Sequence, residues 1–416
     1  MASPLRILVL TDRFTPEIAA PSFRLMEHAK VWRELGHEVT VVTCVPNFPR
    51  GRAFPGYRNL PFQEEVLEGI RVLRVWSYLA PNEGTVRRTL DYLSYMISAV
   101  LQHRRYPEVD VVLASSPPFF VAMAGWALAR LRRCPWVFEV RDLWPASIRA
   151  VGVSAGRGIE LIEKVELGLY RDAERVLALT HAFRDDLVSR GIDEEKIDVV
   201  TNGVDADVFH PGAVSFDARE RLGVPGSAFL AGYLGTIGLA HGLGTLLDVA
   251  EHLRGEPDFR LLLMGEGAQR RPLEEEAARR GLSHVIFRDF APHHEIPSYL
   301  AALDASIVHL RPDPVFRTVI PSKIFESMAM GVPLVMAVEG ESARIVADAG
   351  AGLCVPSGDA PAIAAALREL RGDPAGRERM RRRGMESVRT RYARRRLAEA
   401  ALETLERARA GRGGGR

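Results

Sequence analysis

The chain has 416 residues, of which 47% are hydrophobic and 26% are charged, with a formal net charge of +2. This length exceeds one ordinary hydrophobic core and indicates two domains of about 200 residues each. The nearly balanced charge gives no indication of nucleic-acid binding. Its three cysteines are Cys44, Cys134 and Cys354, and their wide spacing excludes a disulfide framework and a zinc site and fits a reducing cytoplasm.

The first fifty residues follow the pattern of a strand, a helix and a second strand. Arg6–Leu10 is a short apolar run typical of a strand that is buried on both faces, and Glu38–Thr43 is the next such run. Between them, apolar residues recur with helical spacing until Gly36. This order predicts a right-handed crossover between two parallel strands.

The same alternation continues along the rest of the chain, with a loop over 202–212 between two sets. A helix is predicted over Phe119–Arg132. Further strands are predicted at Val109–Ala114, Trp136–Val140, Arg175–Leu179, Ile197–Val200, Phe229–Leu234, Phe259–Met264, Val285–Arg288, Ala305–Val308 and Pro333–Ala337. The sequence therefore predicts an α/β protein with two Rossmann-like, doubly wound domains. Ligands are expected at the carboxyl ends of the strands.

Two common nucleotide-binding motifs are absent from the sequence. The turn from Thr11 to Ala20 has no glycine, which excludes a dehydrogenase G-x-G-x-x-G, and no P-loop occurs. Gly265-Glu266-Gly267 follows a predicted strand, and a ligand-facing loop and a plain turn fit it equally well. Asp205-Ala206-Asp207 has D-x-D spacing, but it lies in the loop between the two sets of strands. We therefore predict no metal site there.

The most informative segment is Ile320-Pro-Ser-Lys-Ile-Phe-Glu-Ser-Met-Ala-Met-Gly-Val-Pro-Leu-Val335. Pro321 and Ser322 predict a helix start, and free backbone N–H groups at such a start suit a diphosphate. Lys323 lies in the first turn, where a cation is unfavourable to the helix dipole unless an anion is bound. Glu326 follows one turn later, where its carboxylate could accept both hydroxyls of a ribose. Singly, these residues fit a solvated surface, but together they favour a nucleotide site.

Five segments, in order, resemble glycosyltransferase family 4. They are Phe14-Thr-Pro-Glu17, Gly36-His-Glu-Val39, Asn202-Gly-Val-Asp205 with Phe209-His-Pro211, Leu263-Met-Gly-Glu-Gly267, and Lys323-Ile-Phe-Glu-Ser-Met-Ala-Met-Gly-Val-Pro333. The resemblance covers nearly the whole chain, from Ile7 to about Leu405. It implies a retaining enzyme with the GT-B fold, in which two Rossmann-like domains face each other across a cleft.

That fold implies a division of the chain into four parts. We expect an acceptor-side domain over 1–205 and a nucleotide-sugar-binding domain over 206–390. A helix over 391–410, with Leu397, Ala401 and Leu405 on one face, is expected to return to the N-terminal domain. Residues 411–416 are expected to form a disordered tail.

Within the family, the chain is most similar to bacterial transferases that build O-antigen, capsule and exopolysaccharide repeats, several of which use UDP-linked N-acetylamino sugars. The shared segments are Arg141-Asp-Leu-Trp-Pro145, Tyr233-Leu-Gly-Thr-Ile-Gly238 with His241-Gly-Leu243, and Pro321-Ser-Lys323. The resemblance implies a phosphate or acceptor loop at Ala19 and Ala20. The donor-binding residues that we expect are Ser322, Glu326, Gly235, Thr236, His241, Gly265, Glu266, Gly267 and Arg317.

The catalytic residues that we expect are Lys323, Arg141 and Asp142. Arg141 and Asp142 follow a predicted buried strand, at its carboxyl end. Lys323 is expected to stabilise the charge that grows on the departing β-phosphate. Two carboxylates flank the reacting bond in glycosidases, and no such pair can be identified here from spacing. The family therefore implies a substrate-assisted retaining route without a metal.

The sequence departs from the family at several charged positions. Thr318 stands where the first of two glutamates, eight residues apart, is usual, so that only Glu326 is kept. Thr236 and His241 stand where an Arg and a Lys usually hold the diphosphate. We expect Lys323 to supply the missing charge, with Arg317 as the second candidate.

We expect a cytoplasmic enzyme that has no membrane span. The start shows no signal-peptide cleavage site, and the apolar run over 89–101 falls short of the roughly 20 residues that a span needs. The segment from Arg87 to Arg105 fits an interfacial helix on the inner membrane face and a core-facing helix equally well. The expected partners are a UDP-sugar and a glycan or lipid-linked acceptor, with no cofactor. Alternatives are a natural-product transferase, a nucleotide-sugar epimerase and a non-catalytic binding protein.

Overall fold

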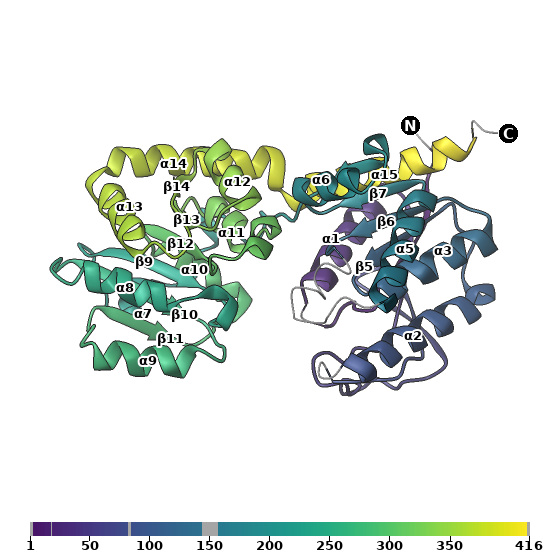
Figure 1. The fold of residues 1–416 in the computed structure, drawn as a ribbon, viewed down its shortest axis with the longest axis horizontal. Helices are drawn as coiled ribbons and strands as arrows, with labels where there is room; N and C mark the ends of the chain where they lie inside the picture. Colours follow the sequence, from purple (N-terminus) through teal and green to yellow (C-terminus); the bar gives the residue numbers. More distant parts are fainter. Residues whose placement is uncertain (1–2, 18, 82–84, 144–156, 414–416) are drawn as a thin grey trace. The chain divides into compact units, whose positions relative to one another are not determined.

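The computed structural model describes residues 3–17, 19–81, 85–143 and 157–413 (Figure 1). The chain forms two compact units. Unit 1 comprises Met1–Thr201 with Arg395–Arg416, and unit 2 comprises Asn202–Arg394. Each unit is built on one sheet, which confirms the predicted α/β class with two doubly wound domains.

The sheet of unit 1 has eight strands in the order β3-β4-β2-β1-β5-β6-β7-β8. Its strands are β1 (Arg6–Leu10), β2 (Glu38–Thr43), β3 (Phe62–Leu67), β4 (Ile70–Val75), β5 (Val111–Ser116), β6 (Trp136–Val140), β7 (Arg175–Ala178) and β8 (Ile197–Val199). Among the described strands of this sheet, only β3 and β4 pair antiparallel. The strand order reverses between β1 and β5, and ligands of open α/β sheets bind at such a switch point.

Two hydrophobic clusters cover the two faces of this sheet. Along β5, Val111 and Leu113 belong to one cluster, while Val112 and Ala114 belong to the other. This alternation follows from the period of two in a strand. The helices of the unit are α1 (Ala20–Glu34), α2 (Thr85–Leu101), α3 (Phe119–Arg132), α5 (Arg157–Asp172), α6 (His181–Ser189) and α15 (Arg394–Gly413).

Helix α15 packs against α1 within unit 1. Leu397, Ala401 and Leu405 join the cluster that contains Trp32, whose indole Nε1 donates to the carbonyl of Ala398 at 2.7 Å. The helix continues to Gly413. The first residues of the predicted disordered tail, 411–413, are therefore helical. Residues 414–416 lie outside the described residues.

The sheet of unit 2 has six parallel strands in the order β11-β10-β9-β12-β13-β14. They are β9 (Phe229–Leu234), β10 (Phe259–Met264), β11 (Val285–Arg288), β12 (Ala305–His309), β13 (Leu334–Ala337) and β14 (Gly352–Cys354). The helices around them are α7 (Ala218–Leu222), α8 (Gly244–His252), α9 (Arg270–Arg279), α10 (Ile296–Ala301), α11 (Lys323–Ala329), α12 (Glu341–Ala349), α13 (Ala360–Gly372) and α14 (Pro374–Ser387). The switch point of this sheet lies between β9 and β12.

Most of the predicted strands are found where the sequence placed them. The bounds of β1, β2, β6, β9, β10, β11 and α3 agree with the prediction. The β3–β4 hairpin and β14 were not predicted. Among the described residues, no helix is both long and apolar enough to span a bilayer.

Candidate active site

The centre of the candidate site in unit 2 is the side chain of Lys323. Its Nζ is buried and has no hydrogen-bond partner in the described part of the chain. The nitrogen lies 3.6 Å from the centroid of the Tyr233 ring, which supplies a cation–π contact. Burial lowers the pKa of Lys323 to about 7, against the opposing effect of the Glu326 charge. Burial also raises the pKa of Glu326, and Lys323 opposes that shift.

The loop that follows β9 runs directly past this ammonium group. Gly235 has a φ of 139°, and a Cβ built on it would lie 2.7 Å from Lys323 Nζ. The amide of Gly235 donates to the carbonyl of Met264, at the end of β10, at 2.8 Å. A glycine is therefore required here both for the backbone conformation and for the approach of the lysine.

Gly265 and Gly267 hold the loop after β10 against the loop after β9. A Cβ on Gly265 would lie 1.8 Å from the carbonyl oxygen of Gly235, and one on Gly267 would lie 2.4 Å from that of Ile237. Glu266 lies between them and is exposed. Its backbone carbonyl accepts a hydrogen bond from the amide of Ile237 at 2.8 Å. The glycine pair thus serves the close packing of two loops.

Thr236 and His241 belong to the same cluster. Thr236 is exposed, and its carbonyl accepts the hydroxyl of Tyr233 at 2.8 Å. The ring of His241 lies 6.1 Å from that of Tyr233. Burial lowers the pKa of His241, and the charge of Lys323 lowers it further. Together with Gly235 and Lys323, these residues gather at the carboxyl end of β9.

The start of α11 differs from the expectation. The helix has only seven residues, and the side chain of Ser322 makes no capping hydrogen bond. The amide of Ile324 donates to the carbonyl of Pro321 at 3.2 Å, and those of Phe325 and Glu326 donate to Ser322 at 3.0 and 3.3 Å. The amides of Ile324, Phe325 and Glu326 are therefore not part of the expected row of free N–H groups, because a tight first turn already engages them. This segment therefore contributes the side chain of Lys323 to the candidate site.

Arg317 has a different location from Lys323. It lies in a short helical turn, Pro314–Thr318, and forms an ion pair with Glu339 that leaves its side chain 62% exposed. With Arg311, Phe316 and Ser357 it lines a pocket of about 150 Å³ beyond the carboxyl ends of β12 and β13. Its charge is thus already paired, unlike that of Lys323.

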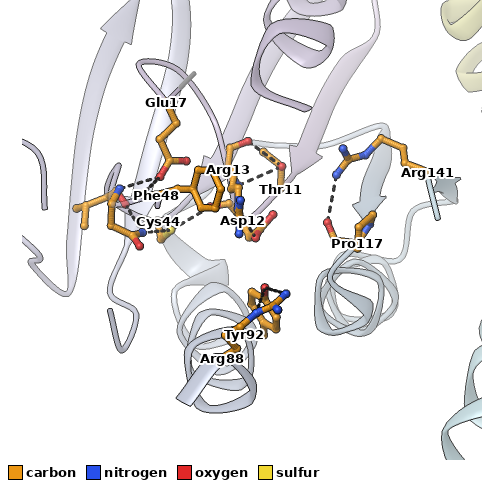
Figure 2. A network of polar contacts seen from close by, with 12 residues as sticks. Thr11, Asp12, Arg13, Glu17, Cys44, Phe48, Arg88, Tyr92, Pro117 and Arg141 are labelled. Atoms are coloured by element: carbon orange, nitrogen blue, oxygen red, sulfur yellow. Dashed lines mark hydrogen bonds and ion pairs between the residues drawn. The ribbon is translucent and has the colours of Figure 1, made fainter. Parts of the chain in front are cut away.

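A second polar cluster lies at the switch point of unit 1 (Figure 2). Arg141 follows β6, donates from Nε to the Ser115 hydroxyl at 2.8 Å, and donates from Nη2 to the Pro117 carbonyl at 3.1 Å. Glu139 is fully buried and is held by the Nε of Arg24 at 3.0 Å, by the Ser115 hydroxyl and, at 4.0 Å, by Arg141. Hydrogen bonds and ion pairs therefore fix the guanidinium of Arg141.

Asp12 was missed by the sequence analysis. It follows β1, is 8% exposed, and lies 3.4 Å from the Nε of Arg13 (Figure 2). Burial raises its pKa, and the charges of Arg13 and Arg141 oppose that rise. Asp91 on α2 lines the same narrow pocket as Asp12, and burial raises the pKa of Asp91 to about 7. The signal that could have found Asp12 is its place directly after a buried strand.

The remaining predicted residues of unit 1 surround this cluster. Asp142 is partly buried next to Arg141. Ala19 is the N-cap residue of α1, in an extended conformation, so it leads from the loop after β1 into the helix. The side chain of Ala20 and residues 144–156, which include Trp144 and Pro145, lie outside the described residues.

The D-x-D triplet forms a turn. The carboxylate of Asp205 accepts the amide of Asp207 at 3.0 Å and lies 3.7 Å from Arg394. No group of three or more His, Cys, Asp or Glu residues within the described ranges could hold a metal ion.

Comparisons with known proteins define the class of this enzyme. A family model described as "Glycosyl transferase 4-like domain" matches residues 21–203, and one described as "Glycosyl transferases group 1" matches residues 215–387. Together with the two parallel-sheet units, these matches define a glycosyltransferase of the GT-B type. The chain belongs to glycosyltransferase family 4, as its sequence motifs indicated.

Two relatives and one solved structure are similar to this chain. The putative colanic acid biosynthesis glycosyl transferase WcaI of Escherichia coli is 24% identical over 378 residues, 88% of this chain and 92% of the relative. The 2-deoxystreptamine glucosyltransferase of Streptomyces kanamyceticus is 25% identical over 361 residues, 85% of this chain and 89% of the relative. The crystal structure of Anabaena HepE in complex with UDP has a TM-score of 0.72 at 19% identity, covers 97% of this chain and 100% of HepE, and so is similar in fold.

Proposed function

We propose that this enzyme is a retaining transferase that moves a sugar from a UDP-sugar to a glycan or lipid-linked acceptor in surface polysaccharide synthesis. The donor sugar that we favour is an N-acetylamino hexose, following the resemblance to that branch of the family. The similarity to WcaI over 88% of this chain supports the polysaccharide role, and the UDP bound to HepE supports the nucleotide.

The observation that carries the proposal is the unpartnered ammonium of Lys323. A buried cation without a hydrogen-bonding partner is costly and is retained only where something compensates for it. The compensation that fits a nucleotide-sugar enzyme is the diphosphate of the donor. Gly235 allows the backbone after β9 to approach the nitrogen closely, at the switch point where ligands of such sheets bind.

The residues then divide the work as follows. Lys323 neutralises charge on the departing β-phosphate, with the backbone around Gly235 and Thr236 beside it. Glu326 accepts ribose hydroxyls. In unit 1, we assign catalytic roles to Arg141, which is held by Ser115 and Pro117, and to Asp142. A substrate-assisted route keeps the configuration of the transferred sugar, and no metal ion takes part.

A donor screen tests this proposal. Thermal shift with UDP, GDP and TDP should single out UDP, and UDP should be released from a UDP-N-acetylamino hexose only when an acceptor is added. NMR of the product should show the anomeric configuration of the donor, and activity should survive EDTA. Release of UDP that does not depend on any acceptor would favour an epimerase. Loss of activity in EDTA that manganese restores would return attention to Asp205 and Asp207.

A natural-product transferase is the second candidate, favoured by the similarity to the 2-deoxystreptamine glucosyltransferase. The two candidates differ in the acceptor and not in the donor site. Transfer to soluble aminocyclitols, with no transfer to polyprenyl-linked glycans, would establish the second candidate over the first.

Contact with a membrane surface forms part of the proposal, and α2 is the helix we assign to it. Tyr95 and Ala99 bury one face of α2 in the core, while Val86, Leu90, Ile97 and Leu101 expose a second apolar face. Arg87 and Arg88 are exposed near its start. An apolar stripe beside basic residues suits the interface of an anionic bilayer. Replacing Leu90 and Leu101 by Ser should release the protein from phosphatidylglycerol vesicles; unchanged sedimentation would remove α2 from this role.

A further inference from the structure

The buried surroundings of Lys323 have a consequence for donor binding. The nitrogen contacts the face of the Tyr233 ring, and the neighbouring loop offers it a glycine rather than a carboxylate. No ion pair within 4.0 Å joins it to an acidic group of the described chain, and its Nζ has no hydrogen-bond partner. An ammonium in such a place loses its hydration and gains little in return.

We infer that Lys323 is largely uncharged in the empty site at slightly alkaline pH and takes up a proton when a diphosphate binds. This inference rests on the proposed donor site and concerns its regulation by pH. Desolvation favours the neutral amine while the site is empty, and a diphosphate beside the nitrogen favours the ammonium. Donor binding and protonation are then linked, so each makes the other more favourable.

Three titratable groups of the described chain surround Lys323: Glu326, His241 and Tyr233. On its own helix, Glu326 lies one turn away, and its charge raises the pKa of Lys323. From the loop after β9, His241 faces it, and its pKa is lowered, so it is neutral above pH 7. Tyr233, from β9, has its pKa raised by burial and stays protonated. The charge of Arg394 lowers the pKa of Glu326.

The sign of the linkage follows from the direction of the shift. The pKa of Lys323 in the empty site is about 7, so the amine is charged well below that pH and neutral well above it. A bound diphosphate raises this pKa, and binding therefore takes up about 0.5 proton at pH 7 and about 0.9 at pH 8. The terminal phosphate of UDP is itself ionised at pH 8, because its last pKa is about 6.

The inference is tested by calorimetry of UDP binding to the full-length protein, at pH 7 and pH 8, in buffers of different ionisation enthalpy. The slope against buffer enthalpy should give about 0.5 and 0.9 proton taken up. The dissociation constant of UDP should rise about tenfold between pH 8 and pH 9. Measurable UDP binding with no proton uptake overturns the inference and leaves the donor site standing. Absence of UDP binding at every pH contradicts the proposed function instead.

Two variants assign the proton to its group. Lys323→Arg carries a guanidinium that stays charged, so UDP binding to it should take up no proton at pH 8. His241→Gln should keep the uptake of the parent. Uptake that persists in Lys323→Arg, or disappears in His241→Gln, overturns the assignment to Lys323. Should Lys323→Arg fail to bind UDP, the pH profile of the parent decides, since a flat profile between pH 7 and pH 8 excludes a group that titrates there.

Discussion

The two units treat buried charge in opposite ways. In unit 1, Glu139 is fully buried, but Arg24, Ser115 and Arg141 surround it with hydrogen bonds and ion pairs. In unit 2, Lys323 Nζ is buried beside the face of Tyr233 and has no hydrogen-bond partner in the described structure. A satisfied network fixes the positions of its members, whereas an unsatisfied charge marks a place that a ligand completes.

This difference indicates that the network around Glu139 stabilises the fold, whereas Lys323 serves the activity. Arg24 donates to the carbonyls of Val200 and Thr201, so the network in unit 1 also holds the end of the chain segment that leaves the unit. Removing one member should therefore cost stability. Removing Lys323 should cost activity and not stability.

The largest effect is expected from breaking the network of unit 1. Glu139→Ala leaves the guanidinium groups of Arg24 and Arg141 buried without their carboxylate, which should cost about 3–5 kcal/mol in the free energy of unfolding. The matched control is Glu64→Ala, which removes an exposed partner of Arg71 and should cost at most about 1 kcal/mol. Denaturant unfolding measures both, and equal losses would show that burial of Glu139 adds nothing.

The next largest effect concerns the chemical step. Lys323→Ala should lower kcat by about 10²–10³, with a smaller change in donor affinity, because its charge acts on the departing phosphate. Arg317→Ala is the matched control, and should change kcat little because Glu339 already pairs with its exposed side chain. Steady-state kinetics that show the reverse order would give the role to Arg317.

A smaller effect should appear in ground-state binding. Glu326→Ala should weaken UDP binding by about 1.5–3 kcal/mol, the scale of hydrogen bonds to a charged group, while the melting temperature changes little. Calorimetry with UDP and with UDP lacking the ribose 2′-hydroxyl distinguishes a ribose contact from a general electrostatic effect. A variant that binds both ligands like the parent would place Glu326 outside the site.

Apolar runs explain why much of the fold could be predicted. Strands such as Phe229–Leu234 are buried on both faces, so a continuous apolar run identifies them. The strand Phe62–Leu67 was missed because it lies at the sheet edge, where its burial is partial and three consecutive residues, Gln63, Glu64 and Glu65, are polar. The strand Gly352–Cys354 has only three residues and gives no pattern.

The candidate site could be predicted in part. The strand pattern indicates which segments lie at neighbouring strand ends. It could therefore predict that Lys323, Gly235 and His241 lie close together. The pairing of Arg317 with Glu339 could not be foreseen, since it depends on how a short turn directs one flexible side chain. The unpartnered state of Lys323 also needs coordinates, because no sequence pattern reports the lack of a contact.

The central claim is that Lys323 is retained for a ligand at a cost to the fold. Its pKa is lowered from 10.5 to about 7, so the unfolded chain binds more protons between these values. The cost is therefore full below pH 7 and is relieved as the pH rises toward 10.5. The most direct measurement is the melting temperature of the parent and of Lys323→Met at pH 6.5, each with and without UDP. Without UDP, the melting temperature of the variant should be about 2 °C or more above that of the parent. UDP should raise the melting temperature of the parent more than that of the variant. The claim would be contradicted if the variant melts below the parent without UDP, or if UDP raises the melting temperature of the variant as much as that of the parent.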